Sequence, residues 1–435
     1  MRRPRSDRSP AACTEPRLTR FFDVRPHEVA VVAWCWLDIF CILGSYYIMR
    51  PIRDQAGVAG GVQNLQWLFT GTLVVMLLLN IPFAYLVRRL PRHRFIAITY
   101  HFFAGNILLF AALFQAADGA QAVWVGRGFF IWVSAFNLFV ISMFWQLNVD
   151  VFSPEQGKRL FGLIAAGATL GAIVGSAVTA SLARHVPPMV LLLGAAALLE
   201  VAVFSAGRLS RLAQAVAGAA EAPIGGGVLA GVTHVVRSPY LLNVGVFLLL
   251  FSITSTFLYF QQATIVGAAF RDRAAQTAFF ATVDLLVNVL TLIVQLFLTA
   301  RIVVLLGVAL TLGVLPALTI VGFGALALLP TVMAVAAFQV VRRAADYAVA
   351  RPARELLYTV ASREDRYKAK SLIDTVVYRT GDQVGAWSAT LLRAVGLGAP
   401  QVSFAAIPLA ALWLVNALWL GRRQERLAER QAGSP

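Results

Sequence analysis

Long apolar stretches follow one another along nearly all of this 435-residue chain, and they constrain its fold more than any other feature. A helix needs about 20 mostly apolar residues to cross the hydrocarbon core of a bilayer. Twelve stretches come near this length, at 28–50, 64–87, 95–117, 124–150, 160–184, 187–206, 239–266, 276–299, 302–328, 330–359, 370–397 and 401–421. Lipid tolerates only backbones whose polar groups are satisfied internally, as they are in helices. We therefore predict an all-α, polytopic membrane protein with twelve transmembrane helices.

The composition agrees with this class. The chain is 59% hydrophobic and 13% charged, whereas soluble domains carry about 25% charged residues. A net charge of +16 would also suit nucleic-acid binding, but most basic residues fall in short loops and tails that alternate along the chain, the pattern that orients membrane proteins. We expect a lipid bilayer around the protein, no nucleic-acid partner and no obligatory protein partner.

The longest break between apolar stretches follows the sixth of them. It divides the chain into a basic tail, a six-helix bundle, a linker, a second six-helix bundle and a second tail, at 1–27, 28–206, 207–238, 239–422 and 423–435. Six plus six helices around a long linker is the plan of the major facilitator transporters. The positive loops predict that the linker and both termini are cytoplasmic.

The segment 342–382 carries dense charge between two apolar stretches. Four of its side chains share one helical face, namely Arg343, Tyr347, Arg351 and Arg354. Guanidinium groups bind phosphate oxygens through paired hydrogen bonds and stack on aromatic rings. This stripe predicts a site for an anionic solute; the alternative is that Asp346 and Glu355 neutralise it within the bundle.

Other polar and aromatic residues concentrate on the first, fourth and seventh stretches, which line the cavity in this architecture. The candidates to contact or enclose the solute there are Arg53, Tyr46, Tyr47, Phe136, Asn137 and Tyr259. Pro51 is expected to weaken the first helix beside Arg53. Asp38 and Asp284 are isolated acids in apolar stretches, and either is a candidate coupling site for a proton.

Two kinds of helix contact are also predicted. Lys370 with Asp374, and Arg379 with Asp382, are spaced to form ion pairs on one helix face and would serve as gate contacts. Gly167, at the start of a series that continues every fourth residue, predicts a close approach between two helices.

Catalytic motifs are absent from the sequence. It contains no Walker loop, no HExxH or CxxC pattern and no nucleophile elbow. We expect no metal, no cofactor and no enzyme activity, so that transport would be driven by an exchanged solute or an ion gradient.

Three stretches resemble a known family: YYIMRPIRDQAGV from Tyr46, FNLFVISMFWQLNVDVFSPEQGKRLFGLIAAGATLGAIVG from Phe136, and RPARELLYTVASREDRYKAKSLIDTVVYRTGD from Arg351. They resemble the ATP/ADP translocases of plastids and intracellular bacteria, and more closely the relatives of these exchangers in free-living bacteria. The resemblance spans nearly the whole chain. It implies the twelve-helix major facilitator fold, nucleotide antiport and a place in a bacterial inner membrane.

The resemblance also implies roles for single residues. It assigns substrate contacts to Arg53, Arg354 and Lys370, with Glu355 and Asp374 beside them. This chain departs from the translocases where arginine replaces their lysine at position 53 and where their acidic residue early in helix 4 falls near Val133. These departures bear on ATP/ADP specificity and leave the fold unaffected.

The expected function is the transport of an organic anion, phosphorylated and with nucleotides as candidates, by alternating access. Two alternatives stay open. A proton-coupled carrier of a non-nucleotide solute would use Asp38 or Asp284, and a non-transporting membrane scaffold or sensor would have fully paired arginines and no cavity.

Overall fold

The computed structural model describes residues 24–25, 27–90, 92–214, 235, 238–360, 369–370 and 372–432, and every regular element within them is helical. The first half contains α2 (Val29–Ala59), η1 (Val62–Asn64), α3 (Leu65–Arg89), α4 (Arg92–Ala116), α5 (Gly119–Val151), α6 (Pro154–Leu182) and α7 (Pro188–Gln214). The second half contains α9 (Pro239–Ala269), α10 (Arg273–Phe297), α11 (Thr299–Leu328), α12 (Val332–Ala345), η2 (Asp346–Ala350), α13 (Arg351–Leu357), η3 (Ile373–Val377), α15 (Tyr378–Ala394) and α16 (Ala399–Ala432). Nearly all of the predicted amino-terminal tail, most of the linker and the loop 361–368 lie outside the described residues.

Ten helices in the described part of the chain are long and apolar enough to cross a membrane. They correspond to ten of the twelve predicted stretches. The two others, 330–359 and 370–397, are the charged stretches, and each is divided by a π-helical segment, η2 or η3.

Pro352 explains the first of these divisions. Proline has no N–H and its ring clashes with the carbonyl four residues earlier, so an α-helix cannot pass it unchanged. The preceding segment η2 widens, and its carbonyls find other partners: Gln295 donates to the oxygen of Tyr347 at 3.3 Å and Thr299 to that of Ala348 at 2.8 Å. The irregular turn is therefore held by α10 and α11.

The expectation for Pro51 was wrong. α2 continues through this proline to Ala59, well beyond the predicted end of the stretch at position 50. Arg50, Arg53 and Asp54 therefore belong to the interior of a long helix.

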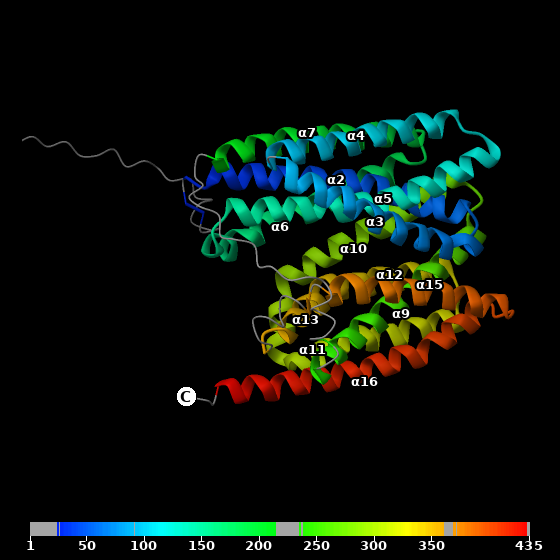
Figure 1. Cartoon of the computed structure of the whole chain (residues 1–435). Helices are drawn as coiled ribbons and strands as arrows, with labels where there is room; N and C mark the ends of the chain where they lie inside the picture. The colour runs from blue at the N-terminus through cyan, green and yellow to red at the C-terminus, as the bar shows by residue number, and fades with distance from the viewer. Residues whose placement is uncertain are drawn as a thin grey trace, which may run out of the picture.

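The helices form two bundles (Figure 1). α2 packs on α6 and α7 in the first bundle, and α9 packs on α15 and α16 in the second. The glycine prediction is confirmed, because a Cβ at Gly167 would lie 2.9 Å from the carbonyl oxygen of Trp36 in α2, and a Cβ at Gly171 would overlap that of Phe40. Gly385 makes a similar approach to Ile253 of α9, so α2–α6 and α9–α15 are equivalent pairs of the two halves.

The two bundles share a core at one end only. A cluster of buried side chains joins Val58, Leu65, Leu68 and Phe130 of the first half to Phe257, Val266, Phe280 and Ala386 of the second. We call this the sealed end. The two remaining clusters each stay within one half, apart from Ala278 near the start of α10, which joins the first. The described residues form no shared cluster at the opposite end, where α2 begins and α16 ends (Figure 1). We call this the terminal end.

Candidate functional site: a charged cavity between the bundles

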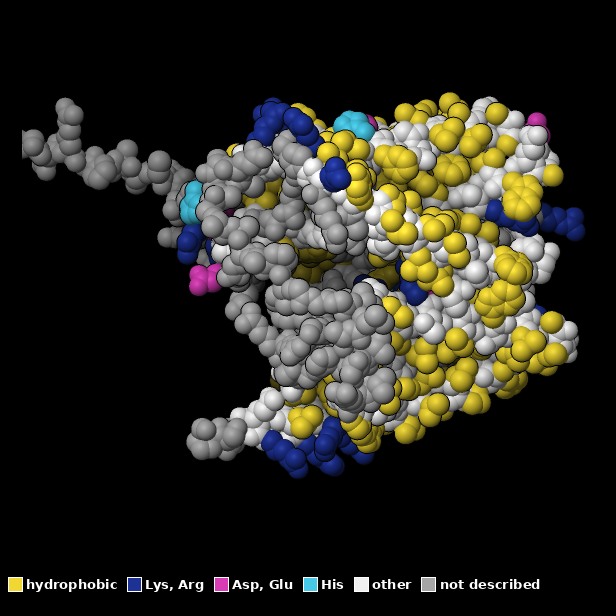
Figure 2. All heavy atoms as spheres, viewed as in Figure 1, with side chains coloured by type: hydrophobic (Ala, Val, Ile, Leu, Met, Phe, Trp, Pro, Cys, Tyr) yellow, Lys and Arg dark blue, Asp and Glu magenta, His cyan; other side chains and the backbone are white. Residues whose placement is uncertain are grey.

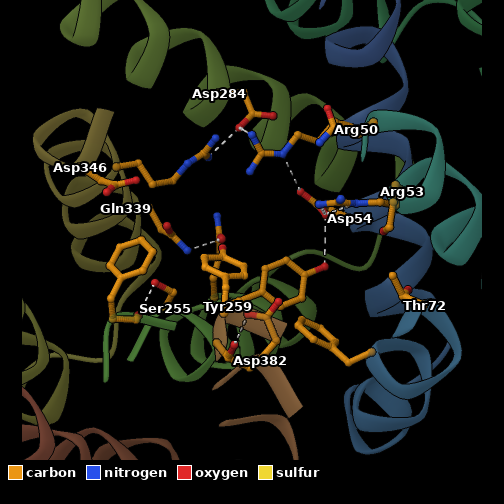
Figure 3. Close-up of a pocket in the computed structure, with 18 of the residues that line it drawn as sticks. Arg50, Arg53, Asp54, Thr72, Ser255, Tyr259, Asp284, Gln339, Asp346 and Asp382 are labelled. Carbon is orange, nitrogen blue, oxygen red and sulfur yellow. Dashed lines mark hydrogen bonds and ion pairs between the residues drawn. The ribbon is translucent and has the colours of Figure 1, made fainter. Parts of the chain in front are cut away.

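A cavity of about 300 Å³ lies between the two bundles. Its lining comes from α2, α3 and α5 on one side and from α9, α10, α12, η2, α13 and α15 on the other. Six arginines and four aspartates take part: Arg50, Arg53, Arg342, Arg343, Arg351, Arg379, Asp54, Asp284, Asp346 and Asp382. Figure 3 shows several of these groups directed toward one another around the open space, and Figure 2 shows the molecule hollowed between its halves. The central cavity, as we call it, thus has two more cations than carboxylates.

Asp284 is shared by two arginines. Its Oδ1 atom accepts from Nη1 of Arg343 at 2.6 Å and lies 3.3 Å from Nη1 of Arg50. The carboxylate is 2% exposed. Since Arg50 belongs to α2 and Asp284 to α10, a buried ion pair joins the two bundles here.

Asp54 forms a second contact between the bundles. Its Oδ1 atom accepts from Nη2 of the neighbouring Arg53 at 2.6 Å and from the hydroxyl of Tyr259 in α9 at 3.1 Å. Arg53 also lies over the ring of Phe130, with 5.3 Å between the guanidinium carbon and the ring centroid. The contacts of Arg53 with Asp54 and with Phe130 orient its side chain along the cavity wall.

Two further ion pairs lie within the second bundle. Nε of Arg351 is 3.3 Å from Asp346, and the Arg351 side chain remains 54% exposed. Nη1 of Arg379 is 3.1 Å from Asp382, which also accepts from the hydroxyl of Ser252 at 2.6 Å. Arg351 is therefore paired but still open to a ligand.

Arg342 is different, because its contacts among the described residues are all with neutral groups. It donates to Thr319 at 3.1 Å, to Thr254 at 3.1 Å and to Ser255 at 2.9 Å. The residue is 3% exposed and stacks near Phe251. Arg342 thus adds to the cavity lining a guanidinium that no carboxylate of the described residues contacts directly.

Neutral groups complete the lining. Nε2 of Gln339 donates to Oε1 of Gln262 at 2.7 Å, which leaves the remaining amide atoms for a ligand. The aromatic rings of Phe69 and Tyr259 meet edge to face with centroids 5.7 Å apart. A solute with both an anionic and a planar part would find matching groups here.

The structure brings about half of the predicted site residues to the central cavity. In its lining are Arg53, Arg343, Arg351, Asn137, Tyr259, Tyr347, Arg379, Asp382 and Asp284. Outside the lining are Tyr46, Tyr47, Phe136, Arg354, Lys370, Glu355, Asp374 and Asp38.

The predicted aromatic residues outside the lining are all buried. Phe136 is fully buried between Phe103 and Trp132. Tyr46 and Tyr47 are also buried, and the guanidinium carbon of Arg50 lies 5.6 Å from the ring centroid of Tyr47. None of the three lines the cavity, because Phe136 packs among core rings and the rings of Tyr46 and Tyr47 pack against each other and beneath Arg50.

The predicted Lys370–Asp374 ion pair is not among those of the described residues. Lys370 instead pairs with Glu355 of α13. Asp374 lies in the π-helical segment η3, whose wider turns displace it from the α-helical register of Lys370. The Arg379–Asp382 pair is present as expected.

Asp38 is fully buried, and neither carboxylate oxygen has a hydrogen-bond partner within the described part of the chain. It is absent from the cavity lining. Of the two candidate coupling acids, only Asp284 has access to the solute path.

The sequence analysis missed several lining residues. Arg342 falls about 100° away from its neighbour Arg343 on a helical wheel, so the one-face argument excluded it. Gln262 and Gln339 carry no charge, and Phe130 resembles any other core aromatic. The signal for Arg342 was its position: it is an arginine in an apolar stretch, one residue before the stripe begins.

Comparison with known proteins bears on the fold. No family model matches the chain, and no curated protein does. A bacterial homologue of the human lysosomal transporter Spinster, in an inward-facing and unoccupied conformation, is 14% identical, with a TM-score of 0.61 over 95% of this chain and 100% of that chain.

Two further solved structures agree. A bacterial homologue of the iron transporter ferroportin in an inward-facing state is 11% identical, with a TM-score of 0.64 over 90% of this chain and 99% of that one. The nucleoside transporter NupG is 15% identical, with a TM-score of 0.57 over 91% and 98%. At these identities the likeness establishes the architecture and not the solute. The chain has the all-helical major facilitator fold.

Proposed function

We propose that the protein is a transporter that moves a phosphorylated organic anion across the bacterial inner membrane by alternating access, with nucleotides as the first solutes to test. The observation that carries this proposal is the charge of the central cavity, where six arginines meet four aspartates. Two cations are left without a carboxylate of their own, and Arg342 has only neutral partners in the described structure. The fold supports transport by alternating access, whereas the phosphorylated solute is suggested by the cavity charge and by the resemblance to ATP/ADP translocases.

The shared carboxylate suggests how the anion drives the movement. Separating the bundles at the cavity breaks the contact between Asp284 and Arg50, and a buried charge that loses its partner costs about 3–5 kcal/mol. A phosphate group can form paired hydrogen bonds with a guanidinium and so take the place of the carboxylate at Arg50 and Arg343. The loaded carrier then changes state more easily than the empty one, which favours exchange.

The sealed end determines which way the cavity opens. The bundles share a core at the end of α2 and are separate at the terminal end. With the termini cytoplasmic, as the positive loops indicate, the cavity faces the cytoplasm. We take this as the inward-open state.

One observation favours a second function, that of a proton-coupled carrier. Asp284 lines the cavity and contacts both bundles, as a coupling acid would. The scaffold alternative is less well supported, because a cavity is present and the arginines outnumber the carboxylates around it.

A thermal-shift screen tests the solute class. The purified protein is heated with ATP, ADP, a sugar phosphate or inorganic phosphate, and with adenosine and glucose as uncharged controls. A solute that binds the folded form must raise the unfolding midpoint. We expect shifts with phosphorylated solutes alone, and a shift with adenosine equal to that with ATP would contradict the proposal.

Uptake into proteoliposomes separates exchange from proton coupling. Vesicles preloaded with the identified anion should take up labelled anion, and an uncoupler should leave this exchange unchanged. Collapse of uptake with the uncoupler would favour the proton-coupled carrier.

The substitution Arg342→Gln tests the charge argument. A hydrogen bond to a charged group contributes about 1.5–3 kcal/mol, so the apparent affinity for the anion should fall roughly 10- to 100-fold. Arg393→Gln is the matched control, since Arg393 is also held by a neutral group, the carbonyl of Phe260 at 3.1 Å, and lies outside the cavity lining. Equal affinity in the Arg342→Gln variant and the wild type would remove this residue from the site.

A further inference from the structure

A second hollow lies on the outer surface of the second bundle at the terminal end. It is a groove of about 710 Å³ between the start of α9 and the last turns of α16. It shares no lining residue with the central cavity. Its residues are Ser238, Pro239, Tyr240, Val415, Leu418, Trp419, Arg422, Arg423, Arg426 and Leu427. We call it the α9–α16 groove.

The groove has an apolar part and a basic part. Val415 is 65% exposed and Trp419 45% exposed, which is the surface that a span presents to lipid chains. Tyr240 lies beside them and donates its hydroxyl to the carbonyl of Leu357 at 2.8 Å. Tyrosine and tryptophan concentrate at the level of the lipid headgroups, so these two rings mark the membrane interface.

The basic part begins within one turn of Trp419. Arg422, Arg423 and Arg426 are exposed, and none forms an ion pair among the residues that the structure describes. Figure 2 shows basic side chains gathered near the terminal end of α16, next to apolar surface. Glu425, which lies between these arginines in the chain, is engaged elsewhere, since its Oε1 atom accepts from the backbone N–H groups of Val308 and Ala309 at 2.9 and 3.2 Å.

That engagement has a local cause. Gly307 has a φ of 71°, and α11 kinks there, so the helix restarts at Val308 with free N–H groups that an acidic side chain can cap. The capped kink directs Glu425 toward α11 and away from the groove. Three guanidinium groups without an ion pair among the described residues are therefore left beside the apolar part of the groove.

We propose that the α9–α16 groove binds an anionic phospholipid of the cytoplasmic leaflet, with its phosphate on Arg422, Arg423 and Arg426 and an acyl chain along Val415, Leu418 and Trp419. The apolar groove next to the three arginines distinguishes this site from an ordinary positively charged loop. Arg208 and Arg211 end α7 in the first bundle on the same side, but Arg208 lies over its own neighbour Phe204, 5.1 Å from the ring centroid. Neither lines the central cavity or the α9–α16 groove.

Tryptophan quenching by brominated lipids tests this site. The full-length protein is reconstituted at equal mole fractions of phosphatidylglycerol or phosphatidylcholine with brominated acyl chains. The chain has nine tryptophans, so the contribution of Trp419 is the difference between the wild type and Trp419→Phe. We expect that contribution to be quenched at a severalfold lower fraction of the anionic lipid than of the zwitterionic one.

The control variants distinguish a specific lipid-binding site from general electrostatic attraction of anionic lipid to basic residues. Arg422→Gln with Arg426→Gln should weaken the preference for the anionic lipid, about fivefold for each arginine removed, while Arg208→Gln with Arg211→Gln should leave it intact. Equal quenching by both lipids, or equal loss in the two double variants, would overturn the proposal. Retention of phosphatidylglycerol in native mass spectrometry gives the same comparison without the tryptophan substitution, and neither readout depends on transport.

Discussion

At the residue scale, the contact that governs the proposed mechanism is the one between Asp284 and two arginines. Arg343 and Arg50 lie 2.6 and 3.3 Å from the same oxygen atom. Removal of the carboxylate would leave two buried cations from different bundles facing each other. This repulsion should lower the stability of the empty protein, and a bound anion should restore it.

The substitution Asp284→Asn is therefore expected to destabilise the empty protein by about 3–5 kcal/mol and to increase the stabilisation by a bound phosphorylated anion. The measurement is the unfolding midpoint in detergent with and without the anion identified by the screen. Asp272→Asn is the matched control, because within the described part of the chain the Asp272 side chain caps α10 through the N–H groups of Ala274 and Ala275 and asparagine caps equally well. An Asp284→Asn variant as stable as the wild type, with an unchanged response to the anion, would contradict this role.

Sequence reasoning found the charged residues of the site better than the aromatic ones. Arg343 and Arg351 reach the cavity because a charged side chain is costly to bury elsewhere in an apolar bundle. Phe136 does not reach it, because an aromatic ring suits both the cavity face and the core face of its helix. The partners of Arg342 are hydroxyls from α9 and α11, and only the three-dimensional fold brings these together.

At the element scale, glycines bring α6 into close contact with α2. Gly171→Ala should lower the unfolding midpoint, because its Cβ would overlap the carbonyl oxygen of Phe40 and overpacking costs about 1–3 kcal/mol. Gly162 in the same helix has open space around it, so Gly162→Ala should be neutral or slightly stabilising. Thermal melts of both purified variants provide the measurement, and equal midpoints would show that α2 and α6 can separate freely.

The start of α2 is held by an ion pair with a defined pH dependence. Burial raises the pKa of the Glu28 carboxyl, but hydrogen bonds from Arg159, from the backbone N–H of Arg25 and from Gln156 outweigh it and hold that pKa at about 2. The pKa is thus lower in the folded protein than the ordinary value of 4.5. The stabilisation is present above the ordinary value and is lost as the pH falls toward the folded one.

Glu28→Gln should consequently lower the unfolding midpoint at pH 7, and its difference from the wild type should shrink as the pH is taken from about 5 to about 3. Glu155→Gln is the control, since Glu155 is an exposed acid in the first turn of α6. Melting curves at several pH values provide the comparison. A difference that does not change with pH would mean that the Glu28 charge contributes nothing.

The sequence predicted the order of the long helices, since ten of the twelve stretches became helices long enough to span a membrane. It did not predict the π-helical segments η2 and η3. Hydropathy measures the length of an apolar run, whereas the path of the backbone at η2 depends on Pro352 and on the donors Gln295 and Thr299 of other helices. Pro51 shows the converse, since the same residue type leaves α2 continuous.

At the scale of the whole molecule, the asymmetry between the two ends distinguishes a transporter state from a fixed scaffold. At the sealed end, α3 and α15 meet through Trp67 and Trp387, whose ring centroids are 4.9 Å apart, and through Thr70 and Gln383, whose side-chain oxygens are 3.0 Å apart. Alternating access requires these contacts to open whenever the cavity turns outward.

A covalent link across the sealed end should therefore stop transport. Thr70→Cys with Gln383→Cys, joined by a short bifunctional thiol reagent in a Cys13→Ser background, should abolish exchange in proteoliposomes while anion binding in the thermal-shift assay persists. The native Cys35 and Cys41 are buried and should not react.

The control joins two helices of one bundle. Asn416 of α16 donates to Asn243 of α9 at 3.0 Å, so Asn243→Cys with Asn416→Cys gives a link of similar length that a rigid rotation of the bundle carries along. Exchange should survive this link and fail with the other, because rocking of two bundles changes distances between them and not within them. Transport that continues with both links in place would mean that the solute does not cross by the opening of the sealed end, and the cavity would then be a binding site without a second exit.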